Sequence, residues 1–462
     1  MKRIAVLALF IVVVIHPSRT HAGQAQADEI ASLMTAAHKV GVLNGTVLVN
    51  YKGKLIYQAS LGYADSTRTR ELSNESRFYV GSIDKEFSGA GLLLLEQQGK
   101  LKLADKVSQY LADYPWANAV QVGQLINYTS GLPELPDLPY GGIHDWLMKL
   151  PALAVKPGIA YIYSYANVYL QQKIIEKITG LDYRQFVISR LLRPCGISDV
   201  QADTALNDPR TALPFSNSFK PVDLTSSMSP GMMFTAFDLF HWMDCLSTNQ
   251  LLNASSLEVI GTSFGGGESN LGSAVIENGR LSRHQHQGSG YNYEALVFSD
   301  AEDPVIIVLL TNNQNFKLFQ LKDAILAILH GQPYAVPKKS IYLDIREGLA
   351  SDFNQEMNNY LQLRQTGKDI YDFSSEPLDL ISAGKYLMRR QKLDEAIAIF
   401  ELSTTSPLSP SDRSYAYELI ADCWLKKGNH GMTVFYYERA LETDSTNKNA
   451  KGKLDGMKEG GQ

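Results

Sequence analysis

The sequence predicts an α+β fold: an antiparallel sheet flanked by helices, with an inserted helical region, followed by an all-α, repeat-like C-terminal region. Strand-like segments occur in pairs at residues 45–63 and again at 293–312, with sequence rich in glycine, proline and helical patterns between them. Beyond residue 335 the pattern changes to pairs of helices. Because segments far apart in a chain can complete one antiparallel sheet, we expect both strand pairs to belong to the same domain.

The first elements are a helix and a hairpin. Residues 29–40 carry apolar side chains at the spacing of one helical face. Residues 45–51 and 54–63 are rich in β-branched and aromatic side chains, and the intervening Lys52-Gly53 is a two-residue turn signal. These residues predict a β-hairpin that follows a helix.

The second strand pair comprises residues 293–299 and 305–312, and a helical pattern follows at 317–330. The segment 333–339 contains two prolines and two lysines, which indicates the end of the domain. We therefore predict four parts: a signal peptide, a sheet domain, a helical connector and a repeat-like region, at residues 1–22, 23–335, 336–375 and 376–462 respectively.

The N-terminus has the build of a cleavable secretory signal. Lys2-Arg3 precedes an apolar run at 4–15, and Thr20-His21-Ala22 precedes polar sequence. Crossing a bilayer takes about 20 apolar residues, so this run is too short for a stable membrane anchor. We expect cleavage after Ala22 and a periplasmic or secreted protein.

Charge and cysteine content exclude some functions. The formal net charge of −5 does not favour a nucleic-acid partner. The three cysteines are Cys195, Cys245 and Cys423, an odd number at wide spacing, so we expect buried thiols without a disulfide framework. Neither metal-ligand spacing nor a phosphate-binding glycine loop is evident, and we expect no metal and no cofactor.

Ser82 and Lys85 are the strongest candidates for chemistry. They lie one helical turn apart, so an amine can reach and activate a hydroxyl nucleophile. Gly81 permits a close backbone approach just before the serine, and the helix start supplies N–H groups that stabilise negative charge. The same Ser-x-x-Lys spacing also occurs at Ser382 and Ser445, so spacing alone proves nothing.

The motifs before and after Ser82 distinguish this Ser-x-x-Lys sequence from the other two. The chain resembles the serine β-lactamase and penicillin-binding-protein superfamily, in the branch of class C β-lactamases, D-amino-acid peptidases and related esterases. The resemblance covers roughly residues 28–332 and rests on several motifs in order. They include Gly45-Thr46-Val47-Leu48-Val49, Gly62-Tyr63-Ala64-Asp65, Ser82 to Lys85, and Leu125-Ile126-Asn127-Tyr128-Thr129-Ser130-Gly131-Leu132-Pro133.

The resemblance implies a second catalytic element, Tyr-x-Asn, whose tyrosine works with the lysine in proton transfer. Placement without gaps from Pro157-Gly158 selects Tyr163, with Tyr165 where the asparagine belongs. Placement by residue identity selects Tyr165-Ala166-Asn167 and requires a two-residue shift. We prefer Tyr163 and leave Tyr165 as the alternative.

A third element, Lys-Thr-Gly or His-x-Gly, is expected on a strand that lines the site. His286-Gln287-Gly288 fits by residue type, whereas His284 has the family's usual spacing to the following Gly290-Tyr291. With His286 chosen, Gly288 would let substrate lie against the strand. The Ser289 N–H would then join that of Ser82 in an oxyanion hole.

The C-terminal part contains helical pairs at 380–402 and 414–441. Small and aromatic residues at Gly384, Ala396 and Phe400 in the first pair fall at spacings that resemble tetratricopeptide repeats. Such repeats imply a possible protein partner.

Together these features predict an exported serine hydrolase that cleaves an amide or ester through an acyl-enzyme on Ser82. The expected substrates are a β-lactam, a D-amino-acid peptide such as one derived from the cell wall, or a small ester. The alternative is a catalytically degenerate penicillin-binding-like protein that serves as a binding or scaffold module with its repeats. Intact Ser82 and Lys85 favour the enzyme.

Overall fold

The computed structural model describes residues 18–136, 138–202, 206–224, 231–264 and 267–459. The apolar run of the predicted signal peptide therefore lies outside the described residues, and Ala22 falls within helix α1 (Ser18–Lys39). Within the described ranges, every helix is too short or too polar to span a bilayer.

The main sheet has six antiparallel strands in the order β2-β1-β9-β8-β7-β6. Their bounds are β1 Gly45–Tyr51, β2 Lys54–Leu61, β6 Ser273–Glu277, β7 Arg280–Gly290, β8 Tyr293–Asp300 and β9 Val305–Thr311. Strand β1 pairs with β9, with Gly45 opposite Thr311. This pairing confirms that the two ends of the domain complete one sheet. Lys52 and Gly53 both have positive φ, as the predicted two-residue hairpin turn requires.

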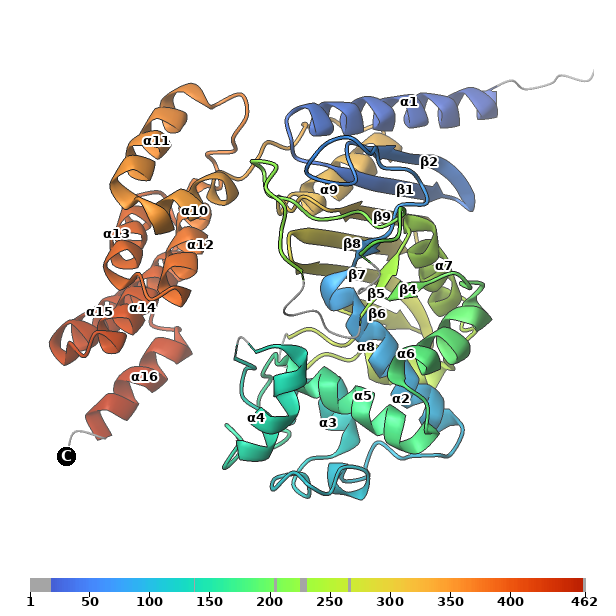
Figure 1. The fold of residues 1–462 in the computed structure, drawn as a ribbon, viewed down its shortest axis with the longest axis horizontal. Coiled ribbons are helices and arrows are strands. Elements are labelled where there is room, and N and C mark those ends of the chain that lie inside the picture. The colour runs from blue at the N-terminus through green and yellow to red at the C-terminus, as the bar shows by residue number, and fades with distance from the viewer. Residues whose placement is uncertain (1–17, 137, 203–205, 225–230, 265–266, 460–462) are drawn as a thin grey trace, which may run out of the picture.

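Helices cover both faces of this sheet (Figure 1). Helices α1 and α9 (Leu318–Leu329) pack on one face in a core with alternate side chains of β1 and β9, such as Val47 and Leu309. The opposite face packs against a larger core that contains the nearly all-buried helix α2 (Lys85–Gln97). The strand side chains alternate between these two cores, as the two-residue period of a strand requires.

The inserted region supplies most of the second face. Its helices are α3 Val122–Ile126, α4 Ile143–Lys149, α5 Tyr165–Thr179, α6 Tyr183–Phe186, α7 Ala236–Ser247 and α8 Ala254–Gly261. A small sheet in the order β3-β5-β4 joins Phe78–Tyr79, Met232–Phe234 and Gln201–Ala202. Thr235 and Asp238 cap the start of α7 reciprocally.

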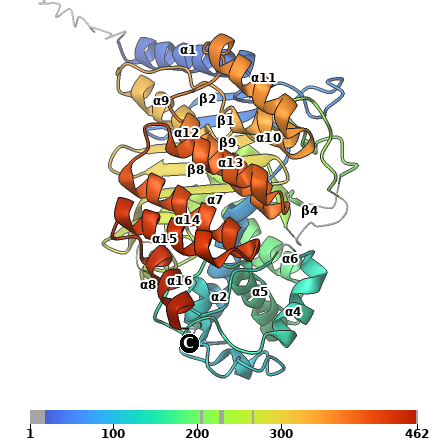
Figure 2. The same cartoon turned by 90° about the vertical axis from the view of Figure 1, so that its left-hand side faces the viewer.

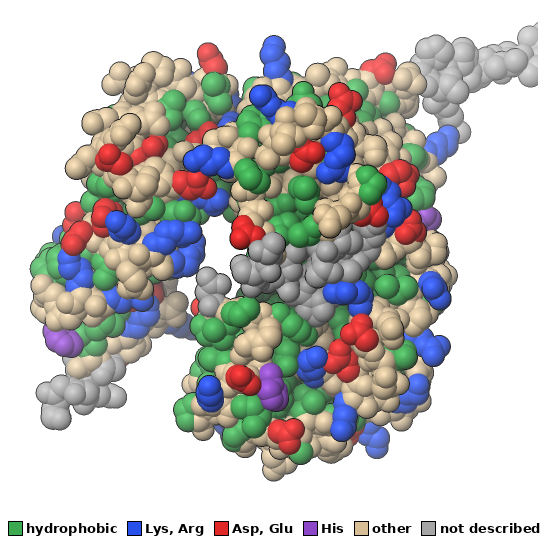
Figure 3. All heavy atoms as spheres, viewed as in Figure 1, with side chains coloured by type: hydrophobic (Ala, Val, Ile, Leu, Met, Phe, Trp, Pro, Cys, Tyr) green, Lys and Arg blue, Asp and Glu red, His purple; other side chains and the backbone are tan. Residues whose placement is uncertain are grey.

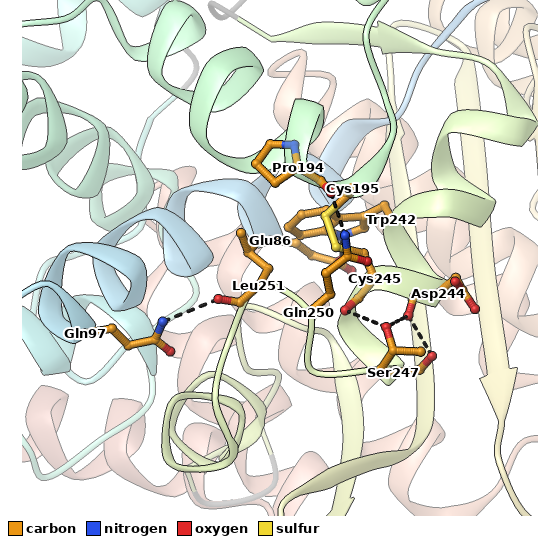
Figure 4. The surroundings of a disulfide bond; sticks show 11 residues. Glu86, Gln97, Pro194, Cys195, Trp242, Asp244, Cys245, Ser247, Gln250 and Leu251 are labelled. Atoms are coloured by element: carbon orange, nitrogen blue, oxygen red, sulfur yellow. Dashed lines mark hydrogen bonds between the residues drawn. A yellow bond between two sulfur atoms is a disulfide. The ribbon is translucent and has the colours of Figure 1, made fainter.

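Two of the three cysteines form a disulfide, Cys195–Cys245, so the expectation of three free thiols was wrong. The two cysteines have a sequence separation of 50, and only folding brings α7 beside the segment that carries Cys195. The bond lies next to Trp242 and Glu86 (Figure 4). Cys423 is free and buried, as expected.

The C-terminal residues form consecutive helices that Figure 2 shows in front of the sheet domain. Their bounds are α10 Tyr342–Ser351, α11 Phe353–Thr366, α12 Glu376–Arg389, α13 Leu393–Thr404, α14 Pro410–Lys426, α15 His430–Thr443 and α16 Lys448–Glu459. We call residues 340–459 the helical region. The expected connector, 336–375, contains α10 and α11, and their residues Ile345 and Tyr360 share a core with α12. A Cβ at Gly384 would lie 2.4 Å from the Phe400 ring, so the glycine is what lets α12 and α13 pack.

Polar contacts join the helical region to the sheet domain. Asp344 accepts a hydrogen bond from Asn217, Arg346 donates to Asn292 at 3.3 Å, and Lys317 pairs with Asp372 at 3.2 Å. Figure 3 shows the two parts in contact above and a hollow between them below. Asn292 belongs to the turn between β7 and β8, so the helical region touches the end of β7.

Candidate active site

Ser82 lies in a one-turn 3-10 helix, η1 (Gly81–Asp84), that runs directly into α2. Gly81 has φ +56°, and a Cβ there would lie 2.3 Å from the Ser289 nitrogen. Gly288 approaches from the strand side, since a Cβ on it would lie 1.8 Å from the Val80 oxygen. The two glycines therefore let strand β7 press against the turn that carries Ser82.

Ser82, Lys85 and Tyr163 lie together. The Ser82 Oγ and Tyr163 Oη atoms are 2.8 Å apart, and Lys85 Nζ donates to the same Tyr163 oxygen at 2.9 Å. Lys85 is only 2% exposed, whereas Tyr163 is 41% exposed. A hydroxyl at the surface is thus connected through a phenol to a buried amine, which is a path for a proton.

The alternative residues of the second element lie elsewhere. Tyr165 is the first residue of α5, and Asn167 is fully buried on that helix. Asn167 accepts a hydrogen bond from Ser130 at 2.6 Å and donates to the Ser164 carbonyl at 3.1 Å. The asparagine therefore fixes the start of α5, and Tyr163 is the tyrosine that reaches Ser82.

Tyr128 is a member of the site that sequence reasoning did not assign. Its ring stacks on Tyr163 with centroids 5.5 Å apart and 28° between planes, and Lys85 Nζ lies 5.6 Å from its centroid. It has φ +57°, which is unusual for a tyrosine, and burial raises its pKa well above the ordinary value. Tyr128 belongs to the motif at 125–133, but the motif alone does not indicate which of its side chains faces the site.

The third expected element, His286-Gln287-Gly288 with Ser289, lies only partly at the site. Gly288 and Ser289 lie beside the Ser82 turn, and Ser289 is exposed at the end of β7. Gly288, however, faces the Val80 oxygen and the Ser82 nitrogen. Its missing side chain makes room for the protein's own backbone, and not for substrate as we expected.

His286 does not face the site, so its predicted contact with substrate does not fit the structure. The ring is buried, and its Nδ1 atom lies 2.6 Å from Glu86 Oε1. His284, the alternative, is also buried, with Nε2 3.0 Å from the same oxygen. Both histidines lie on the inward side of β7 because alternate residues of a strand share a face.

Glu86 is fully buried and paired. Trp242 Nε1 donates to its Oε2 atom at 2.7 Å. Burial opposes ionisation, but the two histidines hold the pKa of Glu86 at about 2. Burial also lowers the pKa of His286, against the opposing effect of Glu86. Glu86 is therefore a buried carboxylate anion.

Glu86, His284 and His286 could by residue type hold a metal ion, with ligand atoms within 4.8 Å of one another. No local pattern indicated this group, because Glu86 and His286 are 200 residues apart in the chain. The fit to an ion is poor. Zinc bonds of about 2.0–2.1 Å set tetrahedral ligand atoms about 3.3 Å apart. The 2.6 Å between Glu86 Oε1 and His286 Nδ1 is the length of a hydrogen bond.

Glu268 is a second residue that the sequence did not reveal. Its carboxylate lies 3.6 Å from Lys85 Nζ, and its side chain is 51% exposed. Nearby, Asn270 donates to the Lys85 carbonyl and to Gln171, both at 2.9 Å. The loop before β6 thus holds the start of α2 and brings a negative charge to the edge of the site.

Most of the chain matches one family of known proteins. Residues 27–332 match the family described as Beta-lactamase. Penicillin-binding protein 4* of Bacillus subtilis is 32% identical over 170 residues, which cover 34% of this chain and 38% of that protein. The putative penicillin-binding protein PbpX of the same organism is 25% identical over 62% of this chain and 75% of its own length.

Solved structures share the fold at low identity. A class C β-lactamase superposes with a TM-score of 0.56 at 18% identity and covers 69% of this chain and 99% of its own. EstCE1, a hydrolase with promiscuous acyltransferase activity, gives 0.53 at 19%, covering 66% and 99%. The D-amino acid amidase of Ochrobactrum anthropi gives 0.54 at 21%, covering 68% and 99%.

The matched family spans the sheet domain from α1 to the end of α9, and the Ser82, Lys85 and Tyr163 side chains meet within it. The chain belongs to the β-lactamase family of serine hydrolases and penicillin-binding proteins.

Proposed function

We propose that this protein is a serine hydrolase that forms an acyl-enzyme on Ser82. The observation that carries the proposal is the continuous contact from Ser82 Oγ through Tyr163 Oη to Lys85 Nζ. A nucleophile needs a neighbour that takes its proton, and here the phenol and the amine lie within hydrogen-bonding distance.

In the proposed reaction, Ser82 Oγ attacks the carbonyl carbon of an amide or ester while its proton passes towards Tyr163 and Lys85. The resulting oxyanion is held by the backbone N–H groups of Ser82 and Ser289. Collapse of the intermediate expels the amine or alcohol, which takes the proton, and leaves an acyl group on Ser82. Water then attacks the acyl carbonyl and releases the acid.

The test is intact mass after exposure to a fluorophosphonate probe. We expect one stoichiometric adduct on wild-type protein and none on Ser82→Ala. Ser382 begins another Ser-x-x-Lys sequence in the helical region, and Ser382→Ala is the matched control that keeps the adduct. Hydrolysis of an activated ester should fall by several orders of magnitude in Ser82→Ala. A wild-type protein that forms no adduct would instead support a binding module.

For the substrate, we propose small esters or D-amino-acid amides and peptides ahead of β-lactams. Two observations support this order. Tyr165 stands where the family motif has the asparagine that orients substrate, and the Glu268 carboxylate opposes anionic groups such as the β-lactam carboxylate. A panel of nitrophenyl esters, D-aminoacyl anilides and nitrocefin would test it, and nitrocefin as the preferred substrate would contradict it.

We also propose that the protein is exported and that the helical region engages a protein or peptide partner. The Cys195–Cys245 bond supports export, because structural disulfides persist in oxidising compartments. Cell fractionation, with N-terminal sequencing to find whether the mature protein begins after Ala22, would test export.

Deleting residues 340–462 tests the role of the helical region. The deletion should leave hydrolysis of a small ester largely intact. If the helical region binds a large cell-wall peptide, the deletion should reduce hydrolysis of that peptide.

A further inference from the structure

Glu86 is a buried meeting point of three structural elements. It lies on α2, Trp242 on α7, and His284 and His286 on β7. Trp242 Nε1 donates to Oε2 at 2.7 Å, while Oε1 lies 2.6 Å from His286 Nδ1 and 3.0 Å from His284 Nε2. One carboxylate thus faces three ring nitrogens from two other elements.

The contact with Glu86 indicates which nitrogen of His286 carries a proton. Because Glu86 is an anion that can only accept, the Nδ1 of His286, 2.6 Å from Oε1, carries the proton of that hydrogen bond. The Nε2 of His284 lies 3.0 Å from the same oxygen without a hydrogen bond to it. The other nitrogen of His284 lies 3.1 Å from the Met243 sulfur. The rings of His286 and Trp242 therefore give each oxygen of the carboxylate one hydrogen bond.

These residues adjoin the reacting groups in the chain. Glu86 directly follows Lys85, and His286 precedes Gly288 by two residues and Ser289 by three. The backbones of Gly288 and Val80 lie too close to admit a Cβ, so a small shift of β7 would change the place of the Ser289 N–H relative to Ser82. Contacts that hold β7 against α2 near these residues therefore affect the distance between the Ser289 N–H and Ser82.

We propose that Glu86 is a positioning residue which, through His284, His286 and Trp242, fixes the oxyanion strand β7 against the nucleophile helix α2. The proposal rests on the proposed acyl-enzyme function of Ser82. It predicts a loss in the rate of acylation, because misplacing an oxyanion donor by about 1 Å costs on the order of 100-fold in rate.

Matched variants distinguish a positioning role of Glu86 and His286 from a role in core packing alone. In His286→Asn, the side-chain amide can place an N–H where Nδ1 stands, whereas His286→Leu fills the space without a donor. We expect His286→Asn to acylate within about threefold of wild type. His286→Leu and Glu86→Gln should both acylate about 10- to 100-fold more slowly with KM for a nitrophenyl ester little changed. Thermal melting and circular dichroism confirm that each variant is folded at the assay temperature.

Two results would overturn the proposal. One is a folded Glu86→Gln protein that acylates at the wild-type rate. The other is His286→Asn slowed as much as His286→Leu, which would mean that the ring's volume, and not its donor, matters.

A measurement on the wild-type protein keeps the proposal testable if the variants do not fold. Nitrogen-15 NMR of the histidine rings should show His286 neutral with its proton on Nδ1 and coupled to a carboxylate. A stoichiometric zinc ion that a chelator removes, with both rings metal-bound, would overturn it. Because this spectrum does not depend on turnover, a protein that forms no acyl-enzyme would refute the proposed function and leave the attachment itself to be judged by the NMR result.

Discussion

The rings of Tyr128 and Tyr163 lie stacked, with centroids 5.5 Å apart and 28° between their planes. Tyr163 is 41% exposed and directly precedes the N-cap residue of α5, and the buried ring of Tyr128 restricts the rotation of the Tyr163 ring. The hydroxyl of Tyr128 makes no hydrogen bond within the described part of the chain. Tyr128 therefore contributes to the site by stacking its ring on Tyr163, and not through its hydroxyl.

Tyr128→Phe should leave ester hydrolysis within about twofold of wild type, because it keeps the ring and removes a buried hydroxyl that lacks a partner. Tyr128→Leu should lower kcat about 10-fold, because Tyr163 loses its stacking partner. Steady-state kinetics on both variants checks this. Equal loss in the two would show that the hydroxyl is needed.

Acid should destabilise the protein through Glu86. Its pKa is about 2 in the folded chain and about 4.5 when unfolded, so the unfolded state binds the proton more readily. The stabilisation is complete above about pH 4.5 and is lost as the pH falls towards 2, by on the order of 3 kcal/mol. Urea unfolding between pH 6 and pH 2.5 should show a steeper loss for wild type than for Glu86→Gln. Parallel curves would contradict the depressed pKa.

Reduction should destabilise the sheet domain. The Cys195–Cys245 bond closes a loop with a sequence separation of 50, and removing such a bond costs about 2–4 kcal/mol. We expect dithiothreitol to lower the melting temperature of wild type and of Cys423→Ala alike, because Cys423 is free. Cys245→Ser should melt at the reduced temperature with or without the reagent. A Cys245→Ser protein as stable as oxidised wild type would disprove the effect.

Glu268 should discriminate substrates by charge. Its carboxylate is half-exposed beside Lys85, so an anionic group in the site meets a repulsion on the order of 1 kcal/mol. Glu268→Gln should raise kcat/KM for an anionic ester relative to its neutral analogue by about fivefold. The ratio of the two substrates cancels any change at Lys85 itself. An unchanged ratio would show that the carboxylate does not face the substrate.

Local patterns predicted much of the fold. The β1-β2 hairpin, the strands β8 and β9 and the helix α9 are each encoded in a continuous stretch, so hydrophobic period and turn residues were enough. Lys85 and Ser82 were found the same way, because one helical turn joins them.

The rest depends on contacts between distant segments. The Glu86 and His286 contact spans 200 residues and the disulfide 50, and no local pattern encodes either pairing. The direction of His286 could not be read from its motif, because a shift of one residue on a strand turns a side chain from one face to the other. The Glu268 and Lys85 contact likewise joins segments far apart in the chain, so no local pattern indicates it.

The place of the disulfide bears on how the protein must be made. Trp242 and Cys245 lie within one turn of α7, so the bond to Cys195 restrains the same turn that presents the indole N–H to Glu86. A chain produced in a reducing cytoplasm would lack that restraint although every residue of the Ser82 site is present. Expression in an oxidising host is therefore part of preparing the protein in its working form.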